Sequence, residues 1–296
     1  MRTRRSFRVR AALVASIAGA VVACVGADPA PTGPADPART NDSGGAGVDA
    51  APPFDAGPFR CEDTPAFEAS LSTLPPSPPA VPRNVIVTPD PNAHLLLVPA
   101  DIADGGATLG VRTGALWLTG LLAGASGFRA TFEYSAYVWS GPPGEGVALA
   151  WAAAVPPTGQ DFGVCGSGVA GHAFALSTAG ATPTLFAHSA SGCPDRSSAP
   201  PLIGAKLLTS ANTPSPWYRV DVTVAPSRVT YALVELGVGA ATDAGPLGPG
   251  WQGSFERGGF DGEAITDVGL TARTGVGADN TAQRVRNLKI FRCTGR

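Results

Sequence analysis

The stretch Phe128-Arg129-Ala130-Thr131-Phe132-Glu133-Tyr134 alternates strictly between apolar and polar side chains. The stretch Tyr218-Arg219-Val220-Asp221-Val222-Thr223-Val224 repeats this pattern. Successive side chains of a β-strand point to opposite faces, so each stretch predicts a strand with one face packed and the other in water. These two segments indicate antiparallel sheets that each cover a hydrophobic core.

Further strand candidates extend outward from these segments in both directions. They are 85–87, 95–98, 115–118, 147–152, 173–176, 229–236, 268–272 and 285–291. Turn-forming sequences separate them, such as Asp104-Gly105-Gly106 and Gly141-Pro142-Pro143-Gly144. No window from Cys61 onward shows a helical repeat of apolar residues. About ten short strands without helices predict an all-β fold, either a sandwich or a barrel.

The amino terminus predicts an export signal that ends at Cys24. Five arginines lie in the first ten residues, and the apolar run 11–23 follows them. A run of about 13 residues is too short to cross a bilayer, which needs roughly 20. The run ends in Val21-Val22-Ala23-Cys24, which resembles a bacterial lipobox and implies cleavage before Cys24 and lipidation of its thiol. The lipoprotein signal peptide would then be residues 1–23. The alternative is an ordinary signal peptide followed by a chance cysteine.

Residues 24–60 predict a disordered linker between this anchor and a folded domain at 61–296. The linker is rich in Ala, Pro, Gly and Asp and has no apolar periodicity. Removal of the five leading arginines leaves 16 basic residues against 23 acidic ones. Such a mildly acidic chain gives no electrostatic reason to expect nucleic-acid binding. We therefore expect an exported protein, lipid-anchored in the bacterial cell envelope, at the outer membrane on its periplasmic or surface side.

Four cysteines remain besides Cys24, and an oxidising compartment favours disulfides among them. Three pairings are possible, and we favour Cys61–Cys293 with Cys165–Cys193. The first pair would join the two ends of the domain, and the second would flank a strand-turn region. A zinc site is the competing interpretation, but the chain has no C-x-x-C motif.

Four segments, in matching order, resemble the legume-type (concanavalin A-like) lectin domain. They are 128–135 (FRATFEYS), 144–151 (GEGVALAW), 171–178 (GHAFALST) and 268–275 (VGLTARTG). A closing strand, 284–291, follows the last of them. The resemblance covers residues 66–293 and implies a jelly-roll sandwich of two large sheets.

The resemblance also implies where a ligand would bind. The family's sugar-binding Asp-Gly pair falls on Glu145-Gly146, which keeps the carboxylate but lengthens its side chain. The loop after Thr274-Gly275 would add backbone donors, and Trp139 could stack against a sugar ring.

The metal ligands of the family are missing at the matching positions. The Glu and Asp that bind metal in the family fall on Ala175 and Ser177, which cannot replace carboxylates on Ca²⁺. We expect no cofactor and no metal site.

Other motifs weigh against catalysis. Gly166-Ser167-Gly168-Val169-Ala170-Gly171 matches G-x-G-x-x-G, but a strand rather than a helix is predicted to follow it, so it is interpreted as a turn. No E-x-D-x-E carboxylate pattern of a glycoside hydrolase occurs. His94, His172 and His188 have no partners at ligand spacing. Trp251, in a loop rich in Gly and Pro, is a second possible platform for a sugar.

Three functions stay open from the sequence. The first is a non-catalytic, carbohydrate-binding envelope lipoprotein whose partner is a glycan or another cell-surface ligand. The second is a structural or adhesive envelope protein whose sandwich has lost sugar binding. The third is a glycoside hydrolase.

Overall fold

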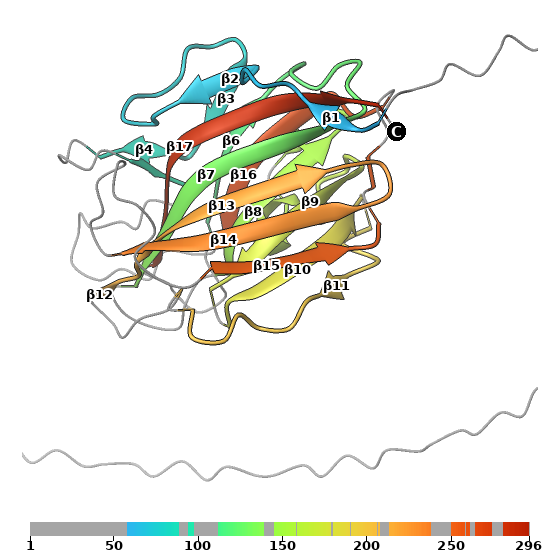
Figure 1. Ribbon diagram of the computed structural model, residues 1–296. Coiled ribbons are helices and arrows are strands. Elements are labelled where there is room, and N and C mark those ends of the chain that lie inside the picture. Colours follow the sequence, from blue (N-terminus) through green and yellow to red (C-terminus); the bar gives the residue numbers. More distant parts are fainter. Residues whose placement is uncertain are drawn as a thin grey trace, which may run out of the picture. The chain divides into compact units, whose positions relative to one another are not determined.

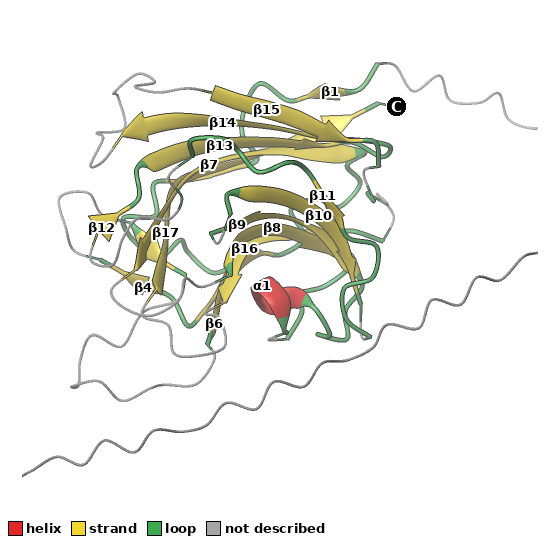
Figure 2. Ribbon diagram, turned by 90° about the horizontal axis from the view of Figure 1, so that it is seen from below, coloured by secondary structure: helices red, strands yellow, loops and turns green. Residues whose placement is uncertain are grey.

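Two antiparallel sheets pack face to face in the computed structural model (Figures 1 and 2). The structure describes residues 58–88, 94–97, 112–138, 145–157, 159–178, 180–189, 191–205, 207, 213–237, 250–257, 259–260, 264–273 and 281–295. The predicted signal peptide, Cys24 and nearly all of the predicted linker lie outside these residues. Within the described ranges, no helix is long and apolar enough for a membrane span.

The larger sheet has ten strands, and its central path runs β15-β14-β13-β7-β17-β5-β4. Strands β1 and β2 also pair with β17, and β12 pairs with β7. The bounds are β1 Arg60–Cys61, β2 Phe67–Ala69, β4 Ile86–Val87, β5 Leu95–Leu96, β7 Gly127–Val138, β12 Thr213–Pro214, β13 Trp217–Val224, β14 Val229–Gly237, β15 Gly250–Phe255 and β17 Thr281–Thr294.

The smaller sheet has seven strands in the order β11-β10-β9-β8-β16-β6-β3. The bounds are β3 Ala80–Arg83, β6 Thr113–Leu118, β8 Gly146–Ala152, β9 Gly171–Ser177, β10 Thr182–His188, β11 Ser197–Ser198 and β16 Asp267–Arg273. This sheet is curved, and the short helix α1 (Asp161–Val164) lies inside the curve (Figure 2).

The main core lies between the two sheets and contains the apolar faces that the sequence pattern predicted. Phe128, Phe132 and Tyr134 of β7 are at most 1% exposed. The Phe128 ring contacts Trp151 of β8 edge-on at 5.6 Å, and so links the two sheets. Burying each such aromatic side chain contributes roughly 1.5–3 kcal/mol, which makes this interface a main source of stability.

Two disulfides join the pairs of cysteines that the sequence favoured. Cys61 is bonded to Cys293, and these residues also face each other in the pairing of β1 with β17. The ends of the described domain therefore lie side by side (Figure 1). Cys165, next to α1, is bonded to Cys193.

Each strand predicted from the sequence overlaps a strand of the structure, but the sequence missed several others. Strand β10 went unpredicted because Pro183 interrupts its apolar pattern, although Pro183 pairs with Leu176 of β9. Strand β15 was interpreted as a loop because of its glycines. Helix α1 was also missed, since its four residues carry no apolar periodicity.

Candidate functional site

The concave face of the seven-stranded sheet has a floor of small side chains. Ala148 and Ala150 of β8, with Ala173 and Ala175 of β9, are fully buried there. They are covered by the segment that contains α1, whose Phe162 packs over them and stacks on Phe186 of β10 at 5.8 Å. The alanines leave room for this segment, so it lies directly on the sheet (Figure 2).

Backbone contacts and one disulfide hold the covering segment in a tight loop. Phe162 and Gly163 both have positive φ, 52° and 85°. The Gly159 amide donates to the Gly163 carbonyl at 2.9 Å, and the Gln160 amide donates to the Cys165 carbonyl at 2.6 Å. The Cys165–Cys193 bond then ties the loop to the segment after β10. A non-glycine residue in the left-handed region is uncommon and marks Phe162 as a constrained position.

Glu145 lies at the rim of this face, immediately before β8. Its amide donates to the Arg273 carbonyl at 3.2 Å, and its own carbonyl accepts from the Thr178 amide at 3.1 Å. Its carboxylate accepts from the Phe162 amide through Oε2 and pairs with Arg273 Nη1 through Oε1 at 2.9 Å. Both carboxylate oxygens therefore bind donors of the protein itself.

Burial raises the pKa of Glu145, and the nearby Asp161 charge raises it further. The hydrogen bond from Phe162 and the Arg273 guanidinium oppose this change. The Glu145 side chain is 21% exposed and that of Arg273 is 15% exposed. This is a half-buried ion pair that fixes the loop to the ends of β8 and β16.

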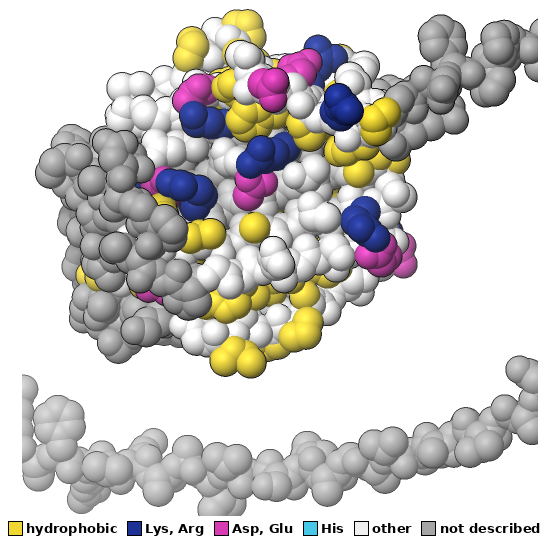
Figure 3. All heavy atoms as spheres, viewed as in Figure 1, with side chains coloured by type: hydrophobic (Ala, Val, Ile, Leu, Met, Phe, Trp, Pro, Cys, Tyr) yellow, Lys and Arg dark blue, Asp and Glu magenta, His cyan; other side chains and the backbone are white. Residues whose placement is uncertain are grey.

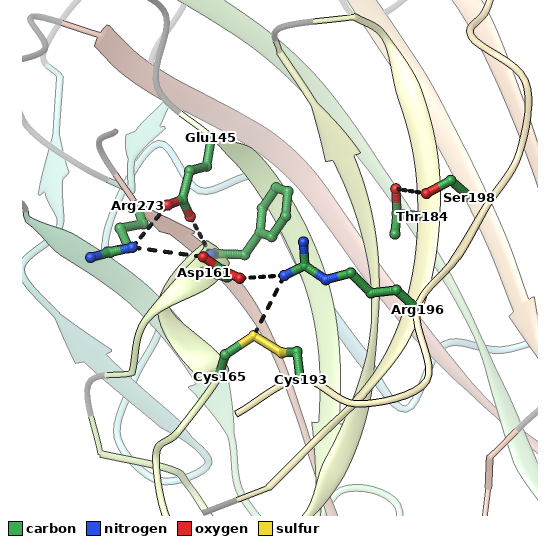
Figure 4. A network of polar contacts seen from close by, with 9 residues as sticks. Glu145, Asp161, Cys165, Thr184, Cys193, Arg196, Ser198 and Arg273 are labelled. Atoms are coloured by element: carbon green, nitrogen blue, oxygen red, sulfur yellow. Dashed lines mark hydrogen bonds and ion pairs between the residues drawn. A yellow bond between two sulfur atoms is a disulfide. The ribbon is translucent and has the colours of Figure 1, made fainter. Parts of the chain in front are cut away.

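A second, more exposed ion pair lies beside the first one (Figure 4). Arg196 Nη2 binds Asp161 Oδ2, and their side chains are 43% and 45% exposed. Asp161 Oδ1 lies 3.9 Å from Arg273 Nη1, so the four charged groups form one chain. The Arg196 guanidinium also lies 5.3 Å from the centre of the Phe186 ring and 4.0 Å from Cys165 Sγ. These contacts restrict the conformations that the Arg196 side chain can adopt.

Gly146, predicted as part of the site, lies between Arg273 and Ser177 in the sheet register. Its φ is +126°, and an added Cβ would lie 2.0 Å from the Leu176 carbonyl oxygen. Only glycine fits this close approach. Ala175 and Ser177, which stand at the positions where the sequence resemblance placed metal ligands, lie on the neighbouring strand β9. Within the described ranges, no three His, Cys, Asp or Glu side chains come together in a metal-binding arrangement.

The remaining predicted residues divide into two groups. Trp139, Thr274 and Gly275 lie outside the described residues, as does Cys24, the predicted lipidation site. Trp251 is corrected from a loop to strand β15, where it packs partly against the core. Its Nε1 donates to the Ile203 carbonyl at 3.3 Å.

Three residues of this site were not predicted from the sequence: Arg273, Asp161 and Arg196. Arg273 belongs to the lectin-like segment 268–275, but nothing in that segment assigns it a role. Asp161 and Arg196 are 35 residues apart and meet only through the covering loop and its disulfide. A pattern of neighbouring residues in the sequence cannot predict a contact between residues so far apart.

Comparisons with known proteins support the same architecture. No protein-family model and no curated protein matches the sequence. The acidic lectin of winged bean, solved with methyl-α-D-galactose, superposes with a TM-score of 0.51 at 12% identity, over 80% of this chain and 99% of the lectin. The Lotus tetragonolobus seed lectin superposes at 0.49 and 10% identity, over 78% and 98%. Lectin I of Ulex europaeus, solved with a methyl glycoside of α-L-fucose, superposes at 0.49 and 12% identity, over 77% and 97%.

These similarities concern the fold. The winged bean lectin, which alone of the three scores above 0.5, has the same two-sheet antiparallel sandwich. The expected legume-lectin-like jelly roll is therefore confirmed as the fold of this chain. At 12% identity, this similarity of fold does not identify a ligand for this chain.

Proposed function

We propose that the protein is a non-catalytic, carbohydrate-binding lipoprotein of the bacterial cell envelope that binds its glycan without metal. The observation that carries this proposal is the exposed Asp161–Arg196 pair at the rim of the concave face. A carboxylate and a guanidinium side by side offer acceptors and donors at a spacing that suits adjacent sugar hydroxyls. The sandwich fold, which other proteins use to bind sugars, supports the same conclusion.

The half-buried Glu145–Arg273 pair has a different role in this proposal. Its charges are already engaged with each other and with the Phe162 amide. Glu145 therefore positions the loop that carries Asp161, and the sugar meets Asp161 and Arg196. Rigid placement of these two side chains lowers the entropy lost on binding. The site needs no Ca²⁺, because the loop is ordered by the Cys165–Cys193 bond and by Glu145 instead.

The proposed anchor rests on the amino-terminal sequence. A basic segment, a short apolar run and a cysteine at position 24 follow one another in the order that lipid attachment requires. Residues 25–60 would then separate the sandwich from the membrane surface, so that its rim can reach a glycan on the cell or beyond it.

The test is a glycan array with the full chain, followed by calorimetry on any sugar that binds. Each good hydrogen bond to a charged group contributes about 1.5–3 kcal/mol, so Asp161→Asn and Arg196→Gln should each weaken binding about tenfold or more. Glu145→Gln should weaken it as well, through the loop.

The matched controls are Arg228→Gln and Glu256→Gln. This pair is also an exposed ion pair, with Arg228 Nη2 at 2.8 Å from Glu256 Oε2, but its residues lie next to the ends of β14 and β15 of the larger sheet. Both control variants should bind like the unmodified protein. If Asp161→Asn and Arg196→Gln also bind normally, the sugar occupies another surface.

A structural or adhesive role is the second candidate. It is favoured by the covering loop itself, since Phe162 fills the floor of the concave face and Glu145 has no free carboxylate oxygen. An array without any bound sugar, in the presence and absence of Ca²⁺, would support this candidate against the first.

A further inference from the structure

The outer face of the ten-stranded sheet carries a cavity where β17 is irregular. Arg286 of β17 pairs with Glu133 of β7, but the next pair is Lys289 with Thr131. One extra residue is therefore inserted in β17, which forms a β-bulge. Asn287 within it has a φ of +53°, a conformation that is rare inside a strand.

The bulge separates two rows of polar side chains that run across the sheet. The first row joins Arg219 of β13 to Glu133 and then to Arg286. The second row joins Thr131 of β7 to Lys289 and then to Glu68 of β2. Acidic and basic side chains lie close together over this face (Figure 3).

A cavity of about 360 Å³ lies at these rows, lined by Glu68, Thr131, Glu133, Arg219, Asn287 and Lys289. Small-molecule sites have volumes of roughly 300–1,000 Å³, so this one suits a ligand of the size of a single sugar. Ala69 and Ser70 complete its wall, and the ring of Phe132 is buried in the core, so most of the side chains accessible in the cavity are polar.

The charges in the cavity are unevenly engaged. The Glu133 side chain is only 4% exposed, and its Oε2 accepts from Arg286 Nε at 2.7 Å. Lys289 Nζ binds Glu68 Oε1 at 2.7 Å. Arg219, however, lies 3.7 Å from Glu133 Oε1, beyond hydrogen-bond distance, and its side chain is 45% exposed. The Arg219 guanidinium is therefore held less tightly than the Lys289 ammonium group. The Glu133 carboxylate that it faces is already neutralised by Arg286.

We propose that this cavity is a second ligand site that takes a sugar bearing a carboxylate, such as a uronic acid. Arg219 would bind the carboxylate through two parallel hydrogen bonds, the geometry that a guanidinium favours. The Asn287 amide can both donate and accept, and the Thr131 hydroxyl can do the same, so these groups suit the ring hydroxyls. The bulge has a function in this arrangement, because it turns Asn287 into the cavity.

Calorimetry of the full chain with D-glucuronate, and with D-glucose as the neutral analogue, tests the proposal. Glucuronate should bind at least tenfold more tightly than glucose. Arg219→Gln should remove this preference. Asn287→Gly keeps the left-handed backbone but removes the amide, so it should weaken glucuronate binding several-fold.

Two control variants complete the experiment. Arg228→Gln removes another exposed arginine, which lies in the turn just before β14 of the same sheet, and should bind glucuronate normally. Arg196→Gln alters the site proposed above on the other sheet, so a loss of glucuronate binding in Arg219→Gln that is larger than the loss in Arg196→Gln assigns glucuronate to this cavity and separates this proposal from the first one.

Three outcomes would overturn the inference: no binding of glucuronate, equal binding of glucose, or normal glucuronate binding by both cavity variants. Thermal unfolding of each variant establishes that it is folded. If Arg219→Gln alone proves unfolded, Asn287→Gly decides the matter, since its substitution leaves the charged rows intact.

Discussion

Lowering the pH from 7 to 5 is expected to destabilise the protein through His188. This residue ends β10 and is 1% exposed. Its Nδ1 donates to the Val169 carbonyl at 3.0 Å, which leaves Nε2 as the unprotonated nitrogen. Among the described residues, Nε2 has no hydrogen-bond partner. Protonation would therefore place a charge and an unsatisfied donor in a buried site.

The size of the effect follows from the pKa of His188. This pKa is lowered from 6.5 to about 4. Burial is the largest cause, the bond to the Val169 carbonyl opposes it, and the charge of His172 acts in the same direction as burial. The folded protein then binds fewer protons than the unfolded chain between these values. The stability that neutral His188 provides is complete above pH 6.5 and is lost as the pH falls toward 4. Linkage gives a loss of about 2 kcal/mol between pH 7 and pH 5.

The assay is urea unfolding at pH 8, 7, 6 and 5 for the unmodified protein and for His188→Asn. Asparagine can keep the bond to Val169 but does not titrate. The variant will be less stable overall because it leaves a cavity, so the informative quantity is the slope of the unfolding free energy against pH. The pKa of His172 is also lowered by burial, so His172 still titrates in the variant. The unfolding free energy of His188→Asn should therefore still depend on pH, but with a smaller slope than in the unmodified protein. Equal slopes in the two proteins between pH 7 and pH 5 would refute this reasoning.

Three other predictions concern the cysteines and metal. Cys24→Ser should release the protein from the membrane fraction, and equal partitioning of both proteins into detergent would contradict lipid attachment. Millimolar Ca²⁺ should leave the melting temperature equal to that in EDTA, because Ala175 and Ser177 replace the expected ligands; a rise of several degrees would reveal a site that we have misplaced. Replacing both Cys61 and Cys293 by serine should destabilise the fold by at most about 5 kcal/mol in a denaturant titration, because their bond closes a loop with a sequence separation of 232 residues. An unchanged midpoint would show that this disulfide does not restrict the unfolded chain.

The alternation in residues 128–134 and 218–224 was enough to predict two strands and their buried faces. This succeeded because the two faces of a strand are set by the backbone geometry of neighbouring residues. The disulfide pairs could be favoured for a related reason. Cys61 and Cys293 mark the ends of the strand-rich region, and terminal strands of a sandwich commonly pair. The four lectin-like segments occur in the same order as in the lectin family, and this order predicted the jelly-roll arrangement of the strands.

The polar sites were decided by tertiary structure alone. Arg219, Glu133 and Arg286 form a row only because β7 lies between β13 and β17 in the sheet. The bulge at Asn287 depends on how β17 pairs with β7, and a sequence pattern does not contain that register. Likewise, Asp161 meets Arg196 because a loop with positive φ folds over a floor of alanines. Alternating polarity records which side chains avoid water, whereas contacts between distant charges depend on strand order, register and loop path.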